Sequence, residues 1–148
     1  MSKHKVRLEW VASPHPQQPT YSRDHTAIIS PQVTIPVSAA AEYLGTPTLA
    51  DPEQLLVNAL ASCHMLYFLA ICEGSGYKVA SYVDEAVGEV SKSPEGAQWV
   101  SSITLHPLVT FGTDKQPDRA ALERLHHRAH KGCFIANSIK SSVTIDLG

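Results

Sequence analysis

The most hydrophobic stretch of the chain lies in its centre and has the start and stop signals of a long helix. Asp51 is a good N-cap, Pro52 fits the first helical position, and Gln54 can complete a capping box. The helix is expected to run to about Glu73 and to stop at Gly74. Leucine, phenylalanine and isoleucine lie on nearly all of its sides, which is typical of a helix buried inside a protein.

Alternating polar and apolar residues predict strands on both sides of this helix. The expected strands cover residues 3–11, 26–30, 32–37, 78–91, 98–111 and 142–147. Pro31 and Pro36 confine one of the early strands to a sheet edge. Pro94 and Gly96 mark a hairpin turn between the two long strands.

A second helix is expected over residues 119–130, amphipathic, with Asp118 as its N-cap and Gly132 at its end. A short helical turn follows it over residues 133–139, before the final strand. This order of strands and helices argues for an α+β fold in which an antiparallel sheet is wrapped around the central helix.

Length and composition limit the class of protein. The 148 residues suit one domain, 1–148, with strands and loops in 1–50 and the helices, hairpin and final strand in 51–148. A hydrophobic share of 43% and a charged share of 18% exclude a mainly disordered chain. A formal charge of −2 gives no basic excess, so we expect neither nucleic acid nor a membrane as a partner. The first residues lack the apolar stretch of a signal peptide, and we expect a soluble, cytoplasmic protein.

Three cysteines are the first candidates for chemistry, because they are too few for a secreted disulfide framework. Cys63 lies deep in the apolar helix, where burial makes a thiol inert unless a cation is near. Cys133 opens a turn after the second helix, where free backbone N–H groups favour a thiolate. Either thiol could instead be core packing. Cys72 is half a turn of the helical wheel from Cys63 and is expected to be structural.

Histidine spacing raises a metal site as an alternative. His126, His130 and Cys133 are ligands of a type that zinc accepts within a short segment. The glutamate of an H-E-x-x-H site is missing, and the neighbouring residues are cationic, so a solvated helix face is the favoured interpretation. His64 points about 100° away from Cys63 on a helix, which argues against a Cys–His hydrolase.

Two charged residues could complete a thiol site. A fixed Arg23 guanidinium would lower the pKa of a thiolate, and the Glu53 carboxylate would orient the guanidinium through two hydrogen bonds. Glu53 is about 15 Å from Cys63 along the helix axis. It could therefore act on the thiol only through a long partner such as Arg23.

Several motifs together resemble the OsmC/Ohr family (osmotically inducible protein C and organic hydroperoxide resistance protein). Asp-Pro-Glu-Gln-Leu-Leu at 51–56 and Ala-Leu-Ala-Ser-Cys at 59–63 are similar to the family's central-helix motif. His-Lys-Gly-Cys at 130–133, with Ile-Ala-Asn-Ser at 135–138, resembles its second cysteine motif. Ser-Arg-Asp at 22–24 falls where the family carries its N-terminal arginine. The order and spacing of the motifs fit across essentially the whole chain.

The resemblance implies a cofactor-free thiol peroxidase that reduces alkyl or lipid hydroperoxides to alcohols in oxidative-stress defence. Cys63 would attack the peroxide and become a sulfenic acid, and Cys133 would convert it to a Cys63–Cys133 disulfide. A dithiol reductant, lipoyl-type or another thiol system, would reduce that disulfide. Arg23 would stabilise the thiolate and the departing oxygen, and Glu53 would hold Arg23. The family is an intertwined homodimer with two sites at the subunit interface.

Some positions depart from the family pattern and point to a less characterised branch. Phe134 stands where the family often has proline, and His64 follows Cys63. The apolar neighbours Leu66, Phe68 and Phe134 suit an alkyl or lipid hydroperoxide better than hydrogen peroxide. The alternative to catalysis is an OsmC-like protein that binds an apolar ligand at the dimer interface.

Overall fold

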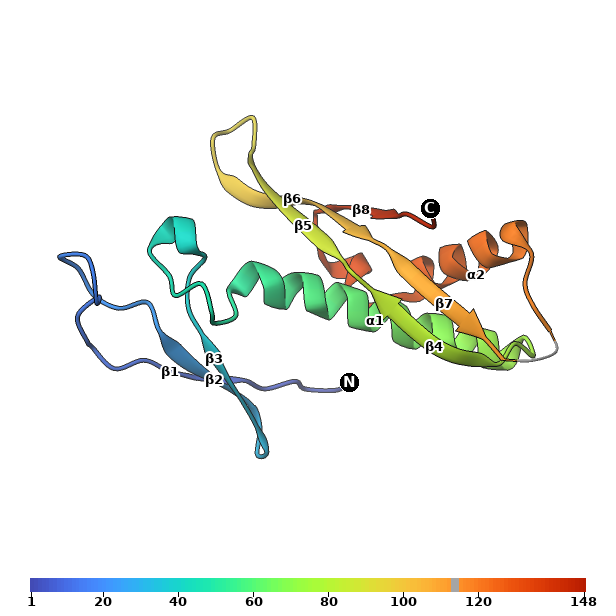
Figure 1. Cartoon of the computed structure of the whole chain (residues 1–148), viewed down its shortest axis with the longest axis horizontal. Coiled ribbons are helices and arrows are strands. Elements are labelled where there is room, and N and C mark those ends of the chain that lie inside the picture. The colour runs from blue at the N-terminus through green and yellow to red at the C-terminus, as the bar shows by residue number, and fades with distance from the viewer. Residues whose placement is uncertain (113–114) are drawn as a thin grey trace. The chain divides into compact units, whose positions relative to one another are not determined.

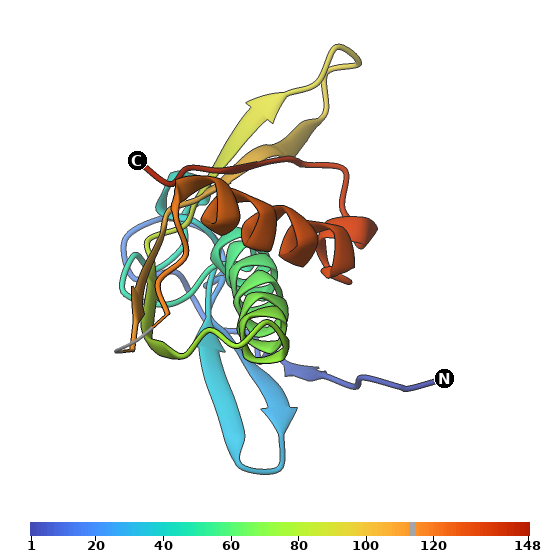
Figure 2. The same ribbon diagram turned by 90° about the vertical axis from the view of Figure 1, so that its right-hand side faces the viewer.

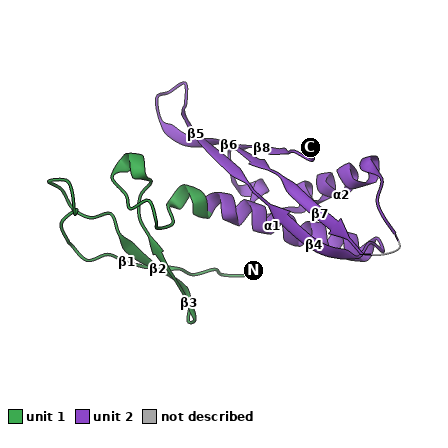
Figure 3. Cartoon of the chain, in the orientation of Figure 1, with its two compact units in different colours: residues 1–55 green, residues 56–148 purple. Residues whose placement is uncertain are grey.

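The computed structural model describes residues 1–112 and 115–148, which form two compact units (Figure 3). Unit 1 comprises residues 1–55 and unit 2 comprises residues 56–148. The order of strands and helices is that of an α+β protein, as the sequence predicts (Figure 1).

Unit 1 is built on a three-stranded antiparallel sheet in the order β1-β2-β3. Its strands are β1 (Arg7–Glu9), β2 (His25–Ser30) and β3 (Val33–Val37). β3 lies at the edge of the sheet, with Pro36 opposite Thr26. Proline has no N–H to donate, and at an edge this costs no hydrogen bond inside the sheet. β1 covers only part of the predicted strand 3–11, because only these three residues pair with β2.

Polar side chains fasten the loops of unit 1 to one another. Asp24 Oδ1 accepts hydrogen bonds from Ser38 Oγ at 2.8 Å and from Thr46 Oγ1 at 2.7 Å. These two bonds lower the pKa of Asp24. The short 3₁₀ helix η1 (Ala41–Tyr43) lies between the two donors along the chain. The segment that carries Arg23 is thereby tied to the loop beyond β3.

Helix α1 (Pro52–Gly74) begins with the predicted capping box. The Gln54 N–H donates to Asp51 Oδ1 at 2.7 Å, and the Asp51 N–H donates to Gln54 Oε1 at 2.9 Å. The helix is long and apolar enough to cross a membrane, but it contributes to both core clusters of unit 2 and acts as a core helix. Its buried residues are spaced four apart on one side: Leu60, His64, Phe68 and Cys72.

The two long strands predicted after α1 are each divided in two, so the prediction of continuous strands over 78–91 and 98–111 was wrong. The strands are β4 (Val79–Asp84), β5 (Val87–Lys92), β6 (Gln98–Leu105) and β7 (Pro107–Phe111). β4 pairs with β7 and β5 pairs with β6, both antiparallel. The division occurs at His106, whose N–H donates to Asp84 Oδ1 at 2.7 Å, and at Pro107, which has no N–H to donate.

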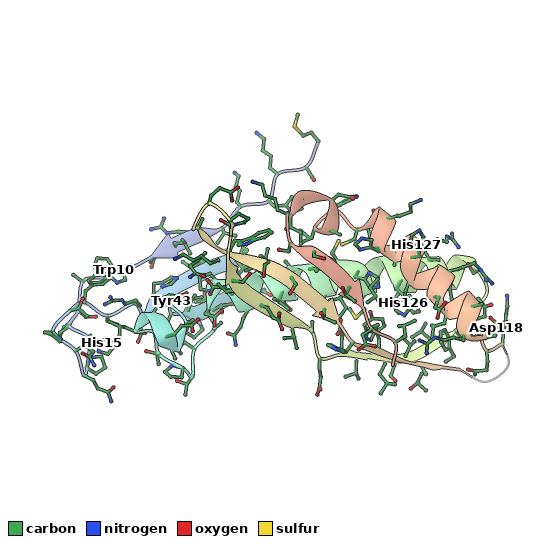
Figure 4. All side chains as sticks on the ribbon, turned by 90° about the horizontal axis from the view of Figure 1, so that it is seen from above. Trp10, His15, Tyr43, Asp118, His126 and His127 are labelled. Atoms are coloured by element: carbon green, nitrogen blue, oxygen red, sulfur yellow. The ribbon has the colours of Figure 1, made fainter. Side chains whose placement is uncertain are left out.

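The last third of the chain contains the second helix and the final strand. Its elements are α2 (Arg119–Gly132), the 3₁₀ turn η2 (Ala136–Ser138) and β8 (Ser142–Ile145). Asp118, labelled in Figure 4, caps α2 by accepting the Ala121 N–H at 2.7 Å. Figure 2 shows α2 beside α1. β8 pairs with β6 in parallel, an exception to the antiparallel pairing of the other strands described.

Candidate thiol site

The structure brings together two of the predicted site residues, Cys63 and Cys133. Cys63 lies on α1 and packs against the core cluster that contains Cys133, at the end of α2. Cys63 is half-buried, whereas Cys133 is completely buried. Cys63 lies near enough to Cys133 to affect the pKa of its thiol, and both cysteines are free thiols. A disulfide between them would therefore join neighbours.

The surroundings of Cys133 act on its thiol in opposite directions. Burial raises the pKa of Cys133, and the adjacent Cys63 raises it further. Backbone N–H groups act the other way, among them that of Ala136, which lies 3.4 Å from Sγ. The sequence correctly placed free N–H groups at this thiol, but the expected preference for a thiolate was wrong because burial outweighs them. Cys133 is a protonated thiol at neutral pH.

Cys72 lies in a different core cluster, as its position on the helical wheel predicted. It is completely buried with Phe68, Leu125 and Ala129. Burial raises the pKa of Cys72 to about 11, so this thiol stays protonated and unreactive. Phe68 belongs to the same closed cluster, and the prediction that it lines the surroundings of Cys63 was wrong.

An exposed apolar surface lies next to the cysteine pair. Leu66, one helical turn after Cys63, is 62% exposed, and Phe134, the residue after Cys133, is 70% exposed. The Phe134 ring meets the Tyr67 ring edge-to-face with centroids 5.6 Å apart. Two of the three predicted apolar neighbours, Leu66 and Phe134, are thus available to an apolar molecule or a second protein surface.

The other two predicted site residues, Arg23 and Glu53, do not contact each other. The Arg23 guanidinium donates to Thr20 Oγ1 at 3.1 Å and to the Tyr21 carbonyl, and it lies 4.0 Å above the centre of the Tyr21 ring. No ion pair between Arg23 and Glu53 occurs within residues 1–112 and 115–148. Glu53 Oε2 is buried and accepts no hydrogen bond from the described residues. The predicted pairing of the two is therefore not formed in this structure.

His126 is not on a solvated helix face, contrary to the favoured interpretation of the sequence. It is only 2% exposed, and its Nδ1 lies 2.9 Å from Nε2 of His64 on α1. Figure 4 labels His126 and its neighbour His127, which is exposed. Within the described part of the chain, no three histidine, cysteine or carboxylate side chains gather as metal ligands, so His126, His130 and Cys133 do not form such a group in this structure.

Sequence reasoning missed the pairing of the two histidines. Apolar residues on nearly all sides of α1 hide the core side in the sequence, and the structure shows it as the side of Leu60 and Phe68, each four residues from His64. That spacing puts His64 on the core side of the helix. It does not identify the partner, because a hydrogen bond between residues 62 positions apart depends on how the helices pack.

Comparisons with known proteins identify relatives over nearly the whole chain. Residues 45–148 match the family model described as OsmC-like protein. An OsmC-like protein of unknown function from Vibrio cholerae is 37% identical, with a TM-score of 0.92 over 99% of both chains. The uncharacterized protein YmaD of Bacillus subtilis is 26% identical over 87% of this chain and 86% of its own length. The organic hydroperoxide resistance protein OhrB of Bacillus subtilis is 18% identical with a TM-score of 0.70, over 99% and 98% of the two chains, which is a likeness of fold.

Proposed function

The chain belongs to the OsmC-like protein family, and on that premise we propose that it is a thiol-dependent peroxidase that reduces organic hydroperoxides in the cytoplasm. The observation that carries the proposal is the interaction of the Cys63 and Cys133 side chains across α1 and the end of α2. The half-buried Cys63 thiol suits attack on the peroxide, and the completely buried Cys133 thiol beside it suits formation of the disulfide.

The proposed cycle has three balanced steps. The Cys63 thiolate attacks the O–O bond, taking one oxygen as a sulfenic acid, and the alkoxide takes up a proton and leaves as an alcohol. The Cys133 thiol then attacks the sulfenic sulfur, which forms the disulfide and releases water. A dithiol, lipoyl-type or another thiol system, reduces the disulfide and is itself oxidised to a disulfide. The cycle uses no cofactor.

The roles of the two thiols follow from their environments. Because burial raises the pKa of Cys133, this thiol stays protonated and is a poor nucleophile toward peroxide in bulk solution. It reacts once the sulfenic acid has formed beside it, because the high effective concentration of a neighbouring group compensates for the low reactivity of a protonated thiol. Cys63, half-buried on α1, is the thiol that a peroxide can reach.

The resemblance supplies the remaining parts of the proposal. Arg23 would stabilise the Cys63 thiolate and the departing oxygen. Glu53, whose buried Oε2 has no hydrogen-bond partner among the described residues, would hold the guanidinium. The exposed Leu66 and Phe134 favour an alkyl or lipid hydroperoxide over hydrogen peroxide. The same apolar surface supports a homodimer, since a second copy would remove it from water.

Thiol counting on the reduced protein tests the cycle. One equivalent of cumene hydroperoxide is expected to remove two thiols, and peptide mapping should find Cys63 joined to Cys133 while Cys72 stays free. Cys63→Ser should abolish peroxide consumption, and Cys72→Ser, the matched control, should retain it. If all three thiols survive the peroxide, the protein is not a peroxidase, and binding of an apolar ligand becomes the better hypothesis.

A further inference from the structure

A buried pair of histidines joins the two helices that carry the reacting cysteines. His64 Nε2 and His126 Nδ1 are 2.9 Å apart, and the residues are 1% and 2% exposed. The two ring planes are parallel, and the Phe68 ring stacks on His126 with centroids 4.1 Å apart. The proposed cycle uses neither histidine, so the pair needs a separate explanation.

The position of the pair links it to the thiols. His64 directly follows Cys63 on α1, and His126 lies two helical turns before Cys133 on α2. Any movement of one helix along the other changes the N–N distance and the distance between the two thiols together. The histidine pair and the cysteine pair therefore report on the same relative placement of the helices.

The hydrogen bond is directional, whereas the contacts around it are not. The other buried residues on this side of α1 are apolar: Leu60, Phe68 and Cys72. Apolar contacts tolerate small shifts, because burial energy depends on area rather than on angle. A buried N–H and lone pair separated from each other lose their only partners among the described residues, which penalises a shift strongly.

The pair is electrically neutral at neutral pH. Burial lowers the pKa of both rings to about 4, and His130, the further ionisable neighbour of His64, adds to the effect on that ring. One neutral ring therefore donates and the other accepts, in a single bond. The pair therefore gives Cys63 no neighbouring imidazolium cation. Its role is to orient the two helices and not to supply charge to the thiol.

We infer that the His64–His126 hydrogen bond fixes α1 against α2 in the one placement that holds Cys63 and Cys133 within bonding reach. Both histidines are positioning residues for the disulfide step, an inference that rests on the proposed function. A buried polar pair that selects one packing arrangement among several similar apolar ones is an established use of such groups.

The effective concentration of the two thiols, measured in a glutathione redox buffer with the full chain, tests the inference. The double variant His64→Phe with His126→Phe keeps two rings in the core and removes the hydrogen bond. We expect it to fold with unchanged or higher stability, since no buried polar group is left unpaired. The effective concentration should nevertheless fall about tenfold or more, because the helices are no longer held in one placement.

Two further variants separate positioning from general stability. His126→Gln introduces a side-chain amide that can hydrogen-bond to His64 Nε2. This variant should keep most of the wild-type effective concentration. His127→Phe, one position along α2 and exposed, should leave it unchanged. A double variant that folds and keeps the wild-type effective concentration would overturn the inference.

A measurement on the wild-type protein covers the case in which the double variant does not fold. A through-hydrogen-bond ¹⁵N–¹⁵N coupling between His64 Nε2 and His126 Nδ1 is expected by NMR, and its absence would also overturn the inference. Glutathione exchange uses no peroxide. If the protein shows the expected glutathione equilibrium but does not consume peroxide, the proposed function is contradicted and the inference on the histidines is not.

Discussion

Cys133 and Cys72 are both completely buried in unit 2, yet their surroundings differ. Cys72 belongs to an apolar core cluster, and burial raises its pKa. Cys133 has a second thiol and a backbone N–H beside it, although burial raises its pKa as well. Two equally buried thiols thus differ in what lies beside them, since Cys133 has a half-buried thiol as a neighbour and Cys72 lies in an apolar cluster.

Removing each thiol in turn gives the largest expected contrast. Cys133→Ser should reduce steady hydroperoxide turnover with a dithiol reductant about 100-fold or more, because resolution loses its intramolecular advantage. Cys72→Ser should leave turnover near the wild-type rate. Alcohol production under steady state measures both. Equal losses in the two variants would contradict the assignment of separate roles to the two clusters.

Phe68→Ala perturbs the cluster that contains Cys72, whereas Cys63 and Cys133 belong to the other cluster. Truncating a completely buried phenylalanine should lower the free energy of unfolding by about 3–5 kcal/mol. Urea unfolding measures this loss. The glutathione equilibrium of Cys63 and Cys133 should change less than in the double phenylalanine variant, because the His64–His126 hydrogen bond remains although His126 loses the stacked Phe68 ring. A change as large as in the double variant would contradict this expectation.

Acid should weaken the region between the two clusters. The pKa values of His64 and His126 are lowered to about 4 in the folded chain, while unfolded histidines take up protons near their ordinary pKa of 6.5. The unfolded state therefore binds more protons between these values, and stability falls as pH falls. The expected loss is about 5 kcal/mol between pH 7 and pH 4.5, about half of it from each histidine. Urea unfolding should show a shallower pH dependence in the double phenylalanine variant than in His127→Phe.

Gly132→Ala is a smaller perturbation at the residue before Cys133, and it is directed at Tyr67, which packs against the Cys72 cluster. A Cβ at this position would lie 2.7 Å from the Tyr67 ring, so the ring or the end of α2 must shift. We expect a loss of about 1–2 kcal/mol in the free energy of unfolding, since overpacking exceeds the gain in helix propensity. Thermal unfolding measures the loss. Combining the change with Tyr67→Ala should remove most of it.

Features that depend on neighbouring residues could be predicted from the sequence. The start of α1 follows from Asp51 and Gln54, which satisfy each other's backbone N–H groups within one turn. The start of α2 follows in the same way from Asp118. The separation of Cys72 from Cys63 follows from helical geometry alone. The family motifs then identified the two cysteines that the fold brings together.

Features that depend on tertiary packing could not be predicted. The alternation of residues 78–91 gives no sign that Asp84 will accept the His106 N–H and end the ladder. The partner of His64 is likewise set by how α2 lies on α1, whereas the cationic neighbours of His126 in the sequence favoured a solvated face. Arg23 resembles a family arginine by position, but its contacts with Thr20 and Tyr21 are fixed by a local loop.

The parallel pairing of β8 with β6 has a consequence for the order in which the chain folds. The connection between these strands includes β7, α2 and Cys133, so the pairing closes a long loop and belongs to the slow, non-local part of folding. The hairpin β5-β6 and the helix that carries Cys63 involve local contacts and form earlier. A newly made chain therefore passes through a period in which Cys63 exists without Cys133 beside it. During that period an oxidant meets a lone thiol, and oxidation can proceed past the sulfenic acid to forms that a dithiol does not reverse.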